Sequence, residues 1–317
     1  MSATSALLQS VLQEDDRAFL EKICAERVCF NQPLAAYTSW KIGGPADAFA
    51  TLHTEEELAL VLQHCARRKL PWFVLGSGSN ILIGDGGIRG VVFRLAGDFS
   101  SIDVQHNGDT KVIVRAGASA GMAAVTSRAA TAGACSISSL AGIPGSVGGS
   151  LRMNAGTDRE VGDFVRSVRV QSPRRSEPHA VDVRYFYRHT SLESDAVVVS
   201  VEFVFDHTDA TQVREEMQQR LVRRKKTQPI ALPNAGSCFR NPEGEKAARL
   251  IEAVGAKGWR EGGAEISELH ANFINNLGNA SAREVATLLA RVRRAVFERF
   301  GVKLQPEVHL VGVFIDV

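Results

Sequence analysis

The sequence predicts an α+β protein that is divided into more than one domain. Its 317 residues exceed the roughly 100 to 150 that one domain of the common size holds. Helical patterns with one apolar face recur along the chain, and two β-branched runs, 168–170 and 196–205, follow one another across a polar turn. The proline-bearing stretch 227–233 is typical of a hinge, so we expect a domain boundary there.

The first recognisable elements are a helix and a strand. Thr54 and Glu57 have the spacing of a capping box, and apolar side chains follow at helical intervals. Residues 54–69 should therefore form an amphipathic helix, which Pro71 ends. Residues 72–75 have the composition of a short buried strand.

The later parts of the chain carry the same two kinds of signal. Residues 111–117 alternate like a strand, and the alanine-rich residues 119–132 should form a helix that Gly133 caps. Residues 211–226 have an apolar helical stripe, and residues 281–300 begin with a second capping box. The closing segment alternates with period two, which places on one strand face Lys303, Gln305, Glu307 and His309.

Two glycine-rich loops are the strongest functional signal. Glycine lets the backbone adopt φ > 0 or approach a partner closely, and free N–H groups in such loops bind anions. Two loops of this kind would hold a diphosphate from both sides, so a bulky dinucleotide is the expected ligand; the alternative is that the glycines serve only as turns. The residues concerned are Gly76, Ser77, Gly78, Ser79, Asn80, Ile81, Ala141, Gly142, Ile143, Gly145, Ser146, Gly148 and Gly149.

Neither loop fits the two commonest phosphate-binding motifs. Ile81 stands where a Rossmann fingerprint needs its third glycine, and no helix obviously opens there. Neither loop ends in the Gly-Lys-Ser/Thr of a P-loop, so hydrolysis of a nucleoside triphosphate is disfavoured.

Composition excludes several classes of protein. A formal net charge of +2 is too small for a nucleic-acid footprint over the whole molecule, and no apolar run approaches the roughly 18 to 20 residues of a membrane span. The five cysteines are scattered, so neither a metal site nor a disulfide framework is expected. Residues 1–8 lack the basic start of a secretion signal, and a cytoplasmic location is expected.

Seven segments in order resemble those of the bacterial UDP-N-acetylenolpyruvoylglucosamine reductases, the MurB family. Together the segments extend over nearly the whole chain, and their number and order make the resemblance specific. They are 38–47, 75–82, 141–156, Tyr187-Arg188, 234–242, 270–274 and 305–308. Because only Ser191–Asp195 separates the Arg188 motif from the next strand, the chain resembles the branch of the family with the shorter loop.

The resemblance implies a fold and a cofactor. The fold would be an FAD-binding domain of the vanillyl-alcohol oxidase and p-cresol methylhydroxylase type, followed by a separate α+β substrate-binding domain. The FAD-binding region would span 1–226, with subdomains at about 20–90 and 91–226, and the substrate-binding domain 227–317. The flavin ring would lie near three further residues, Asn154, Ala155 and Gly156.

The resemblance also implies a reaction and its site residues. NADPH would reduce FAD, which would reduce UDP-N-acetylglucosamine-enolpyruvate to UDP-N-acetylmuramate for peptidoglycan synthesis, and a monomer is expected. The catalytic positions of the family match Arg188, Ser237 and Glu307. Residues expected at the substrate are Lys226, Asn234, Asn241 and Tyr187, although a tyrosine beside a strand is more often a core or rim residue.

The three catalytic residue types fit that chemistry. A guanidinium such as that of Arg188 can hold the enolpyruvyl carboxylate in a bidentate grip. Ser237 can protonate a carbanion-like centre if a neighbouring cation or a water offsets the alkoxide, with Lys226 and Asn241 as candidates for that help. An ionised Glu307 would repel the developing enolate, so we predict for it a raised pKa or a tight ion pair.

Two other functions remain open from the sequence. One is an FAD-dependent alcohol oxidase of the same fold, which the combination of Arg188, Ser237 and Glu307 disfavours. The other is a non-catalytic nucleotide-binding protein that has kept the fold. From composition the basic run 220–226 is first explained as a solvated helix end; the resemblance adds a second explanation, in which Lys226 and Arg223 face the diphosphate of a nucleotide substrate.

Overall fold

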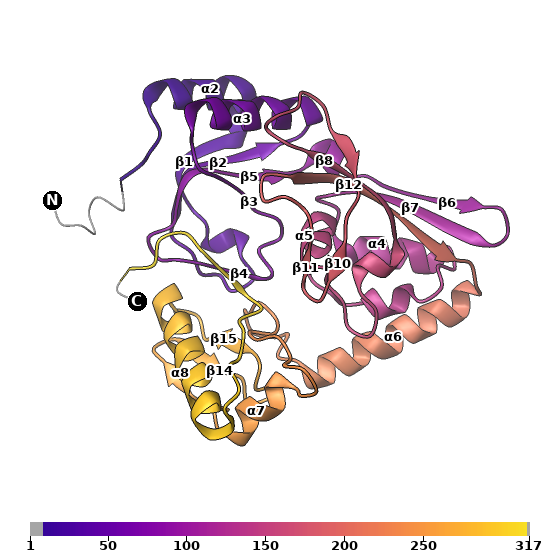
Figure 1. The fold of residues 1–317 in the computed structure, drawn as a ribbon, viewed down its shortest axis with the longest axis vertical. Coiled ribbons are helices and arrows are strands. Elements are labelled where there is room, and N and C mark those ends of the chain that lie inside the picture. The colour runs from indigo at the N-terminus through magenta and orange to yellow at the C-terminus, as the bar shows by residue number, and fades with distance from the viewer. Residues whose placement is uncertain (1–8, 316–317) are drawn as a thin grey trace.

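Three groups of strands and helices follow one another along the chain (Figure 1). The computed structural model describes residues 9–315, so the N-terminal residues 1–8, which bear on the secretion prediction, lie outside the described residues. No helix within 9–315 is both long and apolar enough to cross a membrane.

The first group is a four-stranded sheet with helices α2 and α3 over one face (Figure 1). The order is β1-β2-β5-β3, with β2, β5 and β3 parallel and β1 antiparallel. The bounds are α2 Glu14–Cys24, β1 Val28–Pro33, β2 Pro45–Leu52, α3 Glu55–Arg68, β3 Trp72–Val74 and β5 Ile88–Leu95. Helix α3 confirms the predicted helix over 54–69, and β3 confirms the strand that follows it.

Only half of the capping box predicted for α3 is present. Thr54 caps the helix, its hydroxyl accepting from the backbone N–H of Glu57 at 3.2 Å. The Glu57 carboxylate instead accepts from the N–H of His53 and from the guanidinium of Arg27 at 2.7 Å. An ion pair with a residue distant in the sequence has therefore replaced the reciprocal bond.

The second group is an antiparallel sheet in the order β6-β7-β12-β8-β9. The bounds are β6 Ile102–Asn107, β7 Lys111–Gly117, α4 Met122–Thr131, α5 Val147–Arg152, β8 Val165–Gln171, β9 His179–Val181, β10 Tyr185–Phe186, β11 His189–Thr190, β12 Val197–Asp206 and α6 Ala210–Thr227. The predicted strands 111–117, 168–170 and 196–205 are confirmed. The helix predicted over 119–132 begins only at Met122, because residues 117–121 turn away from β7.

The third group contains two helices and a small sheet. Its bounds are α7 Ala247–Ala253, β13 Arg260–Glu261, β14 Ala264–Ile266, β15 Ile274–Asn276 and α8 Ala282–Phe300. The capping box predicted at the start of α8 is complete, and Gly301 ends the helix with φ 69°. The long helix α6 connects this group to the second sheet (Figure 1).

The last strand returns to the first group. Residues 309–311 form β16, which pairs in parallel with β4 (Ile81–Ile83). The strand predicted over the whole of 302–310 is therefore too long. Pro306 has no N–H to donate, and the segment before β16 is held by single bonds such as that from the N–H of Glu307 to the carbonyl of Cys238, 2.8 Å.

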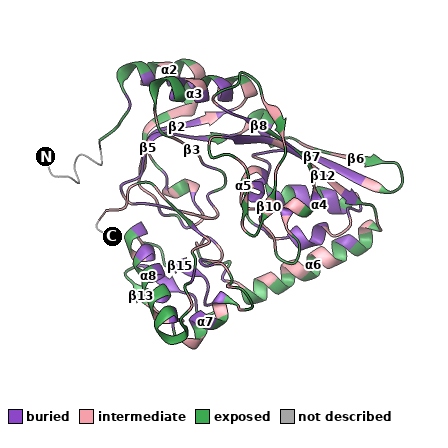
Figure 2. Ribbon diagram, in the orientation of Figure 1, coloured by how far each residue is buried: buried purple, intermediate pink, exposed green. Residues whose placement is uncertain are grey.

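Buried side chains form a core in each part of the molecule, and the central strands of the two large sheets, β2, β5, β7 and β12, are mostly buried (Figure 2). Trp40, from the chain before β2, packs in the core of the third group. The indole N–H of Trp40 donates to the carbonyl of Ile274 at 2.7 Å, and the side-chain amide of Asn276 donates to the backbone carbonyl of Trp40 at 2.8 Å. These buried contacts hold the third group against the first.

Candidate functional site

A cavity of about 1470 Å³ lies where the three groups meet. Its wall includes parts of both glycine-rich loops, the turn between β10 and β11, the segment after α6 and the residues before β16. Nineteen of the residues predicted from the sequence line it: Gly76, Ser77, Gly78, Ser79, Asn80, Ile81, Gly142, Ile143, Gly145, Ser146, Gly149, Ala155, Gly156, Tyr187, Arg188, Asn234, Ser237, Asn241 and Glu307.

Four predicted residues lie elsewhere. Gly148 lines a smaller neighbouring cavity, whereas Ala141 and Asn154 are buried behind the wall. Lys226 is exposed and does not line the cavity, although the preceding residue, Lys225, does.

The two loops touch each other and leave backbone donors free. A Cβ on Gly145, which has φ 117°, would lie 3.0 Å from the hydroxyl oxygen of Ser79, and one on Gly78 would collide with the carbonyl of Tyr37. Within residues 9–315 the N–H groups of Gly76, Ser77 and Gly78 donate to no protein acceptor. The loops therefore form the kind of cradle that an anionic group fits.

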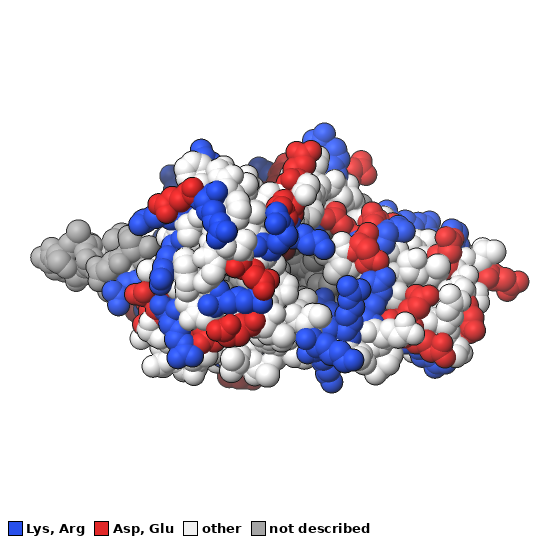
Figure 3. Space-filling model, turned by 90° about the horizontal axis from the view of Figure 1, so that it is seen from below, with Lys and Arg blue, Asp and Glu red and all other residues white. Residues whose placement is uncertain are grey.

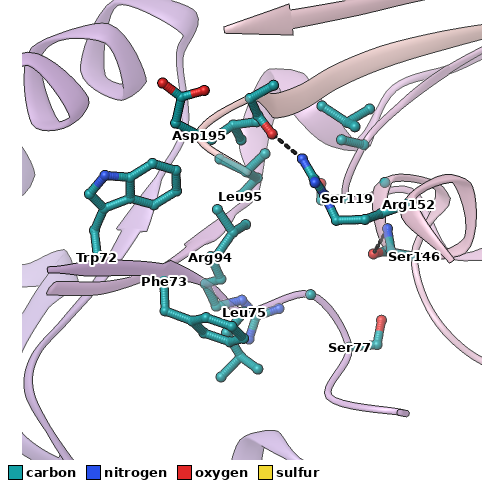
Figure 4. Close-up of a pocket in the computed structure, with 18 of the residues that line it drawn as sticks. Trp72, Phe73, Leu75, Ser77, Arg94, Leu95, Ser119, Ser146, Arg152 and Asp195 are labelled. Carbon is teal, nitrogen blue, oxygen red and sulfur yellow. Dashed lines mark hydrogen bonds between the residues drawn. The ribbon is translucent and has the colours of Figure 1, made fainter. Parts of the chain in front are cut away.

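The smaller cavity, about 560 Å³, shares Gly76, Ser77 and Ser146 with the larger one. Trp72 and Phe73 of β3 line it, with their side chains on opposite faces of the strand (Figure 4). From the other side Arg152 donates to the carbonyls of Glu193 and Ala196, which holds the short loop before β12 against α5. The two cavities therefore adjoin at the glycine-rich loops.

Arg188 is held from three directions. Its Nε donates to Oε1 of Glu307 at 2.9 Å, its Nη1 to Oε1 of Glu160 at 3.1 Å and its Nη2 to the carbonyl of Gly156 at 2.9 Å. Only 13% of the Arg188 side chain is exposed. The guanidinium also lies 4.6 Å from the centre of the Tyr187 ring, a cation–π contact.

Both features predicted for Glu307 are present. Burial raises the pKa of Glu307 above its ordinary value, against the opposing effects of the Arg188 and Arg240 charges. The ion pair with Arg188 is the second feature. The side-chain amide of Asn80 also donates to the carbonyl of Glu307 at 3.1 Å, which ties a glycine-rich loop directly to this residue.

Ser237 lies on the cavity wall between two well-anchored neighbours. Gly236 has φ 76°, and its N–H donates to the side-chain oxygen of Asn234 at 3.0 Å. Cys238 is buried in the core, as expected for a free cysteine, and donates its N–H to the carbonyl of Asn272 at 2.8 Å. Burial raises the pKa of the Cys238 thiol to about 12, so at neutral pH this neighbour carries no charge.

The other residues predicted to contact substrate have structural partners. The amide of Asn234 donates to the carbonyls of Pro229 and Leu232, and the side-chain oxygen of Asn241 accepts from the N–H of Ala247 at 3.1 Å. The Tyr187 hydroxyl accepts from the N–H of Asn241 at 3.4 Å. These residues shape the wall through their own hydrogen bonds.

Two arginines that line the cavity, Arg224 and Arg240, were not predicted as site residues from the sequence. The Arg224 guanidinium makes no hydrogen bond or ion pair to any group within residues 9–315, and burial lowers its pKa. Arg240 has its Nε buried without a hydrogen-bond partner among the described residues. Lysine and arginine side chains also stand beside the hollow on the face seen in Figure 3. Both lie in segments that the sequence marks as notable: Arg224 in the basic run 220–226, and Arg240 in the segment 234–242, which resembles the MurB family.

The comparisons with known proteins agree with this geometry. Residues 46–174 match the model of an FAD-binding domain, and residues 228–311 match that of the UDP-N-acetylenolpyruvoylglucosamine reductase C-terminal domain. A reductase of this name from Moorella thermoacetica is 41% identical over 290 residues, which cover 90% of this chain and 94% of that protein. The chain belongs to the UDP-N-acetylenolpyruvoylglucosamine reductase family.

Further relatives have the same architecture. A reductase of the family from Anaeromyxobacter is 39% identical over 302 residues, covering 95% of this chain and 93% of that protein. The crystal structure of the MurB reductase from Thermus caldophilus superimposes with a TM-score of 0.76 at 32% identity, covering 89% and 97% of the two chains. p-Cresol methylhydroxylase, at 10% identity and a TM-score of 0.52, covers 95% of this chain and 90% of its own and shares the fold. The predicted fold class is thereby confirmed.

The cradle can be tested directly, because a side chain at Gly145 would enter it. We expect Gly145→Val to lower FAD occupancy, since its Cβ would meet the opposite loop and its φ is unfavourable for an L-residue. The measurement is the ratio of 450 nm to 280 nm absorbance of purified protein. Gly108→Val is the matched control, since Gly108 also has positive φ but no heavy atom near its Cβ position. If the Gly145→Val protein binds FAD at full occupancy, Gly145 serves only to form the turn.

Proposed function

We propose that this cavity is where the protein reduces UDP-N-acetylglucosamine-enolpyruvate to UDP-N-acetylmuramate, a step of peptidoglycan synthesis. The observation that carries the proposal is that Arg188, Ser237 and Glu307, distant in the sequence, line the same cavity as the two glycine-rich loops. FAD, when bound, accepts a hydride from NADPH and delivers it to C3 of the enolpyruvyl group. The residues of the chain must then bind the substrate, stabilise charge and supply a proton at C2.

The residues that would hold FAD are those of the two loops. Their free N–H groups suit its diphosphate, and the smaller cavity beside β3 suits the adenosine end, where Trp72 and Phe73 offer aromatic surface (Figure 4). Ala155 and Gly156 line the larger cavity next to Arg188, which suits the flavin ring. This arrangement agrees with the FAD-binding match over residues 46–174.

Arg188 is the group that would bind the enolpyruvyl carboxylate. Negative charge builds at C2 and on that carboxylate as C3 is reduced, and a guanidinium close by stabilises it. The substrate would bring a third carboxylate to a cation that Glu160 and Glu307 already share. Because one cation cannot neutralise three carboxylates in a buried site, Glu307, whose pKa is already raised, takes up a proton and no longer repels the enolate.

Ser237 would deliver the proton to C2. Its side chain lines the cavity, and the neighbouring backbone is anchored by Asn234 and Asn272. A positioned hydroxyl can act as a general acid where cations offset the alkoxide that forms, and Arg240 and Lys225 lie on the same wall. After the transfer, Ser237 would regain its hydroxyl proton from solvent.

The proposal predicts a spectroscopic cycle. The purified protein is expected to be yellow, to lose its 450 nm band on anaerobic addition of NADPH, and to regain it when the enolpyruvyl substrate is added. An alcohol oxidase would instead be reduced by its alcohol, and a non-catalytic protein would show neither change. Colourless protein that takes up no FAD would exclude the proposal.

Arg224 should contact a phosphate of the nucleotide substrate. Its guanidinium is partly buried beside Gly142 without an anion among residues 9–315, and a charged hydrogen bond contributes about 1.5–3 kcal/mol. We expect Arg224→Gln to raise the KM for the UDP-sugar about 10- to 100-fold. Arg223→Gln is the matched control, since Arg223 is exposed and does not line the cavity. Equal KM values for the two variants would contradict this role.

The remaining assignments concern the molecule as a whole. We propose the division into an FAD-binding region at 1–226 and a substrate-binding domain at 227–317, a monomeric state and a cytoplasmic location. Sedimentation of the FAD-loaded protein at several concentrations tests the monomer.

A further inference from the structure

Arg188 has a second carboxylate partner behind the cavity wall. Glu160 does not line the cavity, yet its Oε1 accepts from Nη1 of Arg188 at 3.1 Å, opposite the bond from Nε to Glu307. We propose that Glu160 is a positioning residue: it fixes the direction of the Arg188 guanidinium and keeps Glu307 from being the sole counter-ion of that cation. This inference rests on the proposed role of Arg188 in binding the substrate carboxylate.

Glu160 is itself fixed by a buried residue. The side-chain amide of Asn154 donates to Oε2 of Glu160 and to the carbonyl of Phe186, while its oxygen accepts from the N–H of Gly162 at 2.9 Å. Asn154 is 1% exposed and has φ 43°, a left-handed conformation that asparagine tolerates. A rigid chain of contacts therefore runs from Asn154 through Glu160 to the guanidinium.

The backbone turn around Glu160 restricts it further. The Asp163 carboxylate accepts from the N–H of Glu160 at 3.1 Å, and the N–H of Asp163 donates to the backbone carbonyl of Glu160 at 3.1 Å, which closes a single helical turn. The turn therefore fixes the backbone of Glu160 and leaves its carboxylate to Asn154 and Arg188. The Asp163 carboxylate forms an ion pair with Arg159 and not with Arg188, so Asp163 holds the turn without touching the guanidinium of the site.

The charges explain why a second carboxylate affects Glu307. Burial raises the pKa of both Glu160 and Glu307, and the one guanidinium between them lowers both. Neutralising Glu160 leaves the whole charge of Arg188 to Glu307 and removes a negative neighbour, so the pKa of Glu307 falls. The other titratable or charged groups near the two carboxylates are Arg240, Cys238 and His309 on the Glu307 side, and Asp163 and Arg159 on the Glu160 side.

The test variant is Glu160→Gln in the FAD-loaded enzyme, followed by anaerobic stopped-flow absorbance at 450 nm. The amide keeps an acceptor for Arg188 but loses the charge and the second acceptor oxygen, which bonds Asn154. We expect reduction by NADPH to be unchanged and reoxidation by the enolpyruvyl substrate to slow about 10- to 100-fold. The reoxidation rate should also begin to fall with rising pH about one unit earlier than in the parent enzyme, because Glu307 loses its proton at lower pH.

Two further variants separate the possible outcomes. Asp163→Asn disturbs the same backbone turn and should leave the pH profile of reoxidation in place. Glu160→Gln should add little to the loss caused by Arg188→Ala if Glu160 acts through Arg188. A uniform slowing at every pH in Glu160→Gln, equal to that of Asp163→Asn, would overturn the inference and leave the proposed function standing. Undiminished reoxidation in Arg188→Ala would overturn the proposed function itself.

Discussion

Ser237→Ala is expected to leave the reduction of FAD by NADPH intact and to slow its reoxidation by the enolpyruvyl substrate about 10²- to 10⁴-fold. The reason is that only the second half-reaction needs a proton at C2. Ser237 lies on the cavity wall, and its neighbour Cys238 is buried with a pKa of about 12, so that thiol cannot replace the lost hydroxyl. Rapid mixing of the pre-reduced enzyme with substrate, followed at 450 nm, measures the reoxidation half-reaction without the NADPH half-reaction.

Ser237→Cys is the matched variant, since it keeps a proton donor of similar size. We expect it to retain more of the reoxidation rate than Ser237→Ala. If Ser237→Ala reoxidises at the parent rate, Ser237 has no part in the proton transfer, and the NADPH half-reaction measured in the same sample shows whether the protein is otherwise sound.

Arg188→Ala is expected to slow reoxidation about 10²- to 10³-fold, the size of loss that follows removal of one donor to a developing oxyanion. The substitution removes the group that would bind the substrate carboxylate. It also leaves Glu160 and Glu307 without the cation between them, so the pKa of both should rise further. The weakened binding should appear as a raised Kd when oxidised enzyme is titrated with substrate.

Arg184→Ala is the control for this loss of charge. Arg184 precedes the same turn but is exposed and does not line the cavity. Arg188→Lys keeps the charge and loses the planar fork, so it should recover part of the rate. Equal rates for Arg184→Ala and Arg188→Ala would remove Arg188 from the reaction.

Elements marked by short-range signals were predictable from the sequence. Helix α8 carries a complete capping box and a terminal glycine, and both are present. The glycine-rich loops were recognised because their composition reflects a backbone requirement at Gly78 and Gly145, where a Cβ would meet the chain or the opposite loop. Such features depend on a few neighbouring residues.

Contacts between distant segments were not predictable in this way. The pairing of β4 with β16, and of Glu160 with Arg188, joins residues far apart in the chain that share no local pattern. In the basic run, successive side chains on α6 point about 100° apart. Composition alone therefore does not say that Arg224 and Lys225 line the cavity while Lys226 does not.

The parallel pairing of β4 with β16 has a consequence for how the enzyme is made. Strand β4 follows the first glycine-rich loop directly, yet its partner lies within the last ten residues of the chain. The first sheet leaves the ribosome long before residues 309–311 are made, so β4 has no strand partner until that later segment has been synthesised. A fragment ending at the hinge therefore lacks both Glu307 and the strand that pairs with β4 next to the first glycine-rich loop.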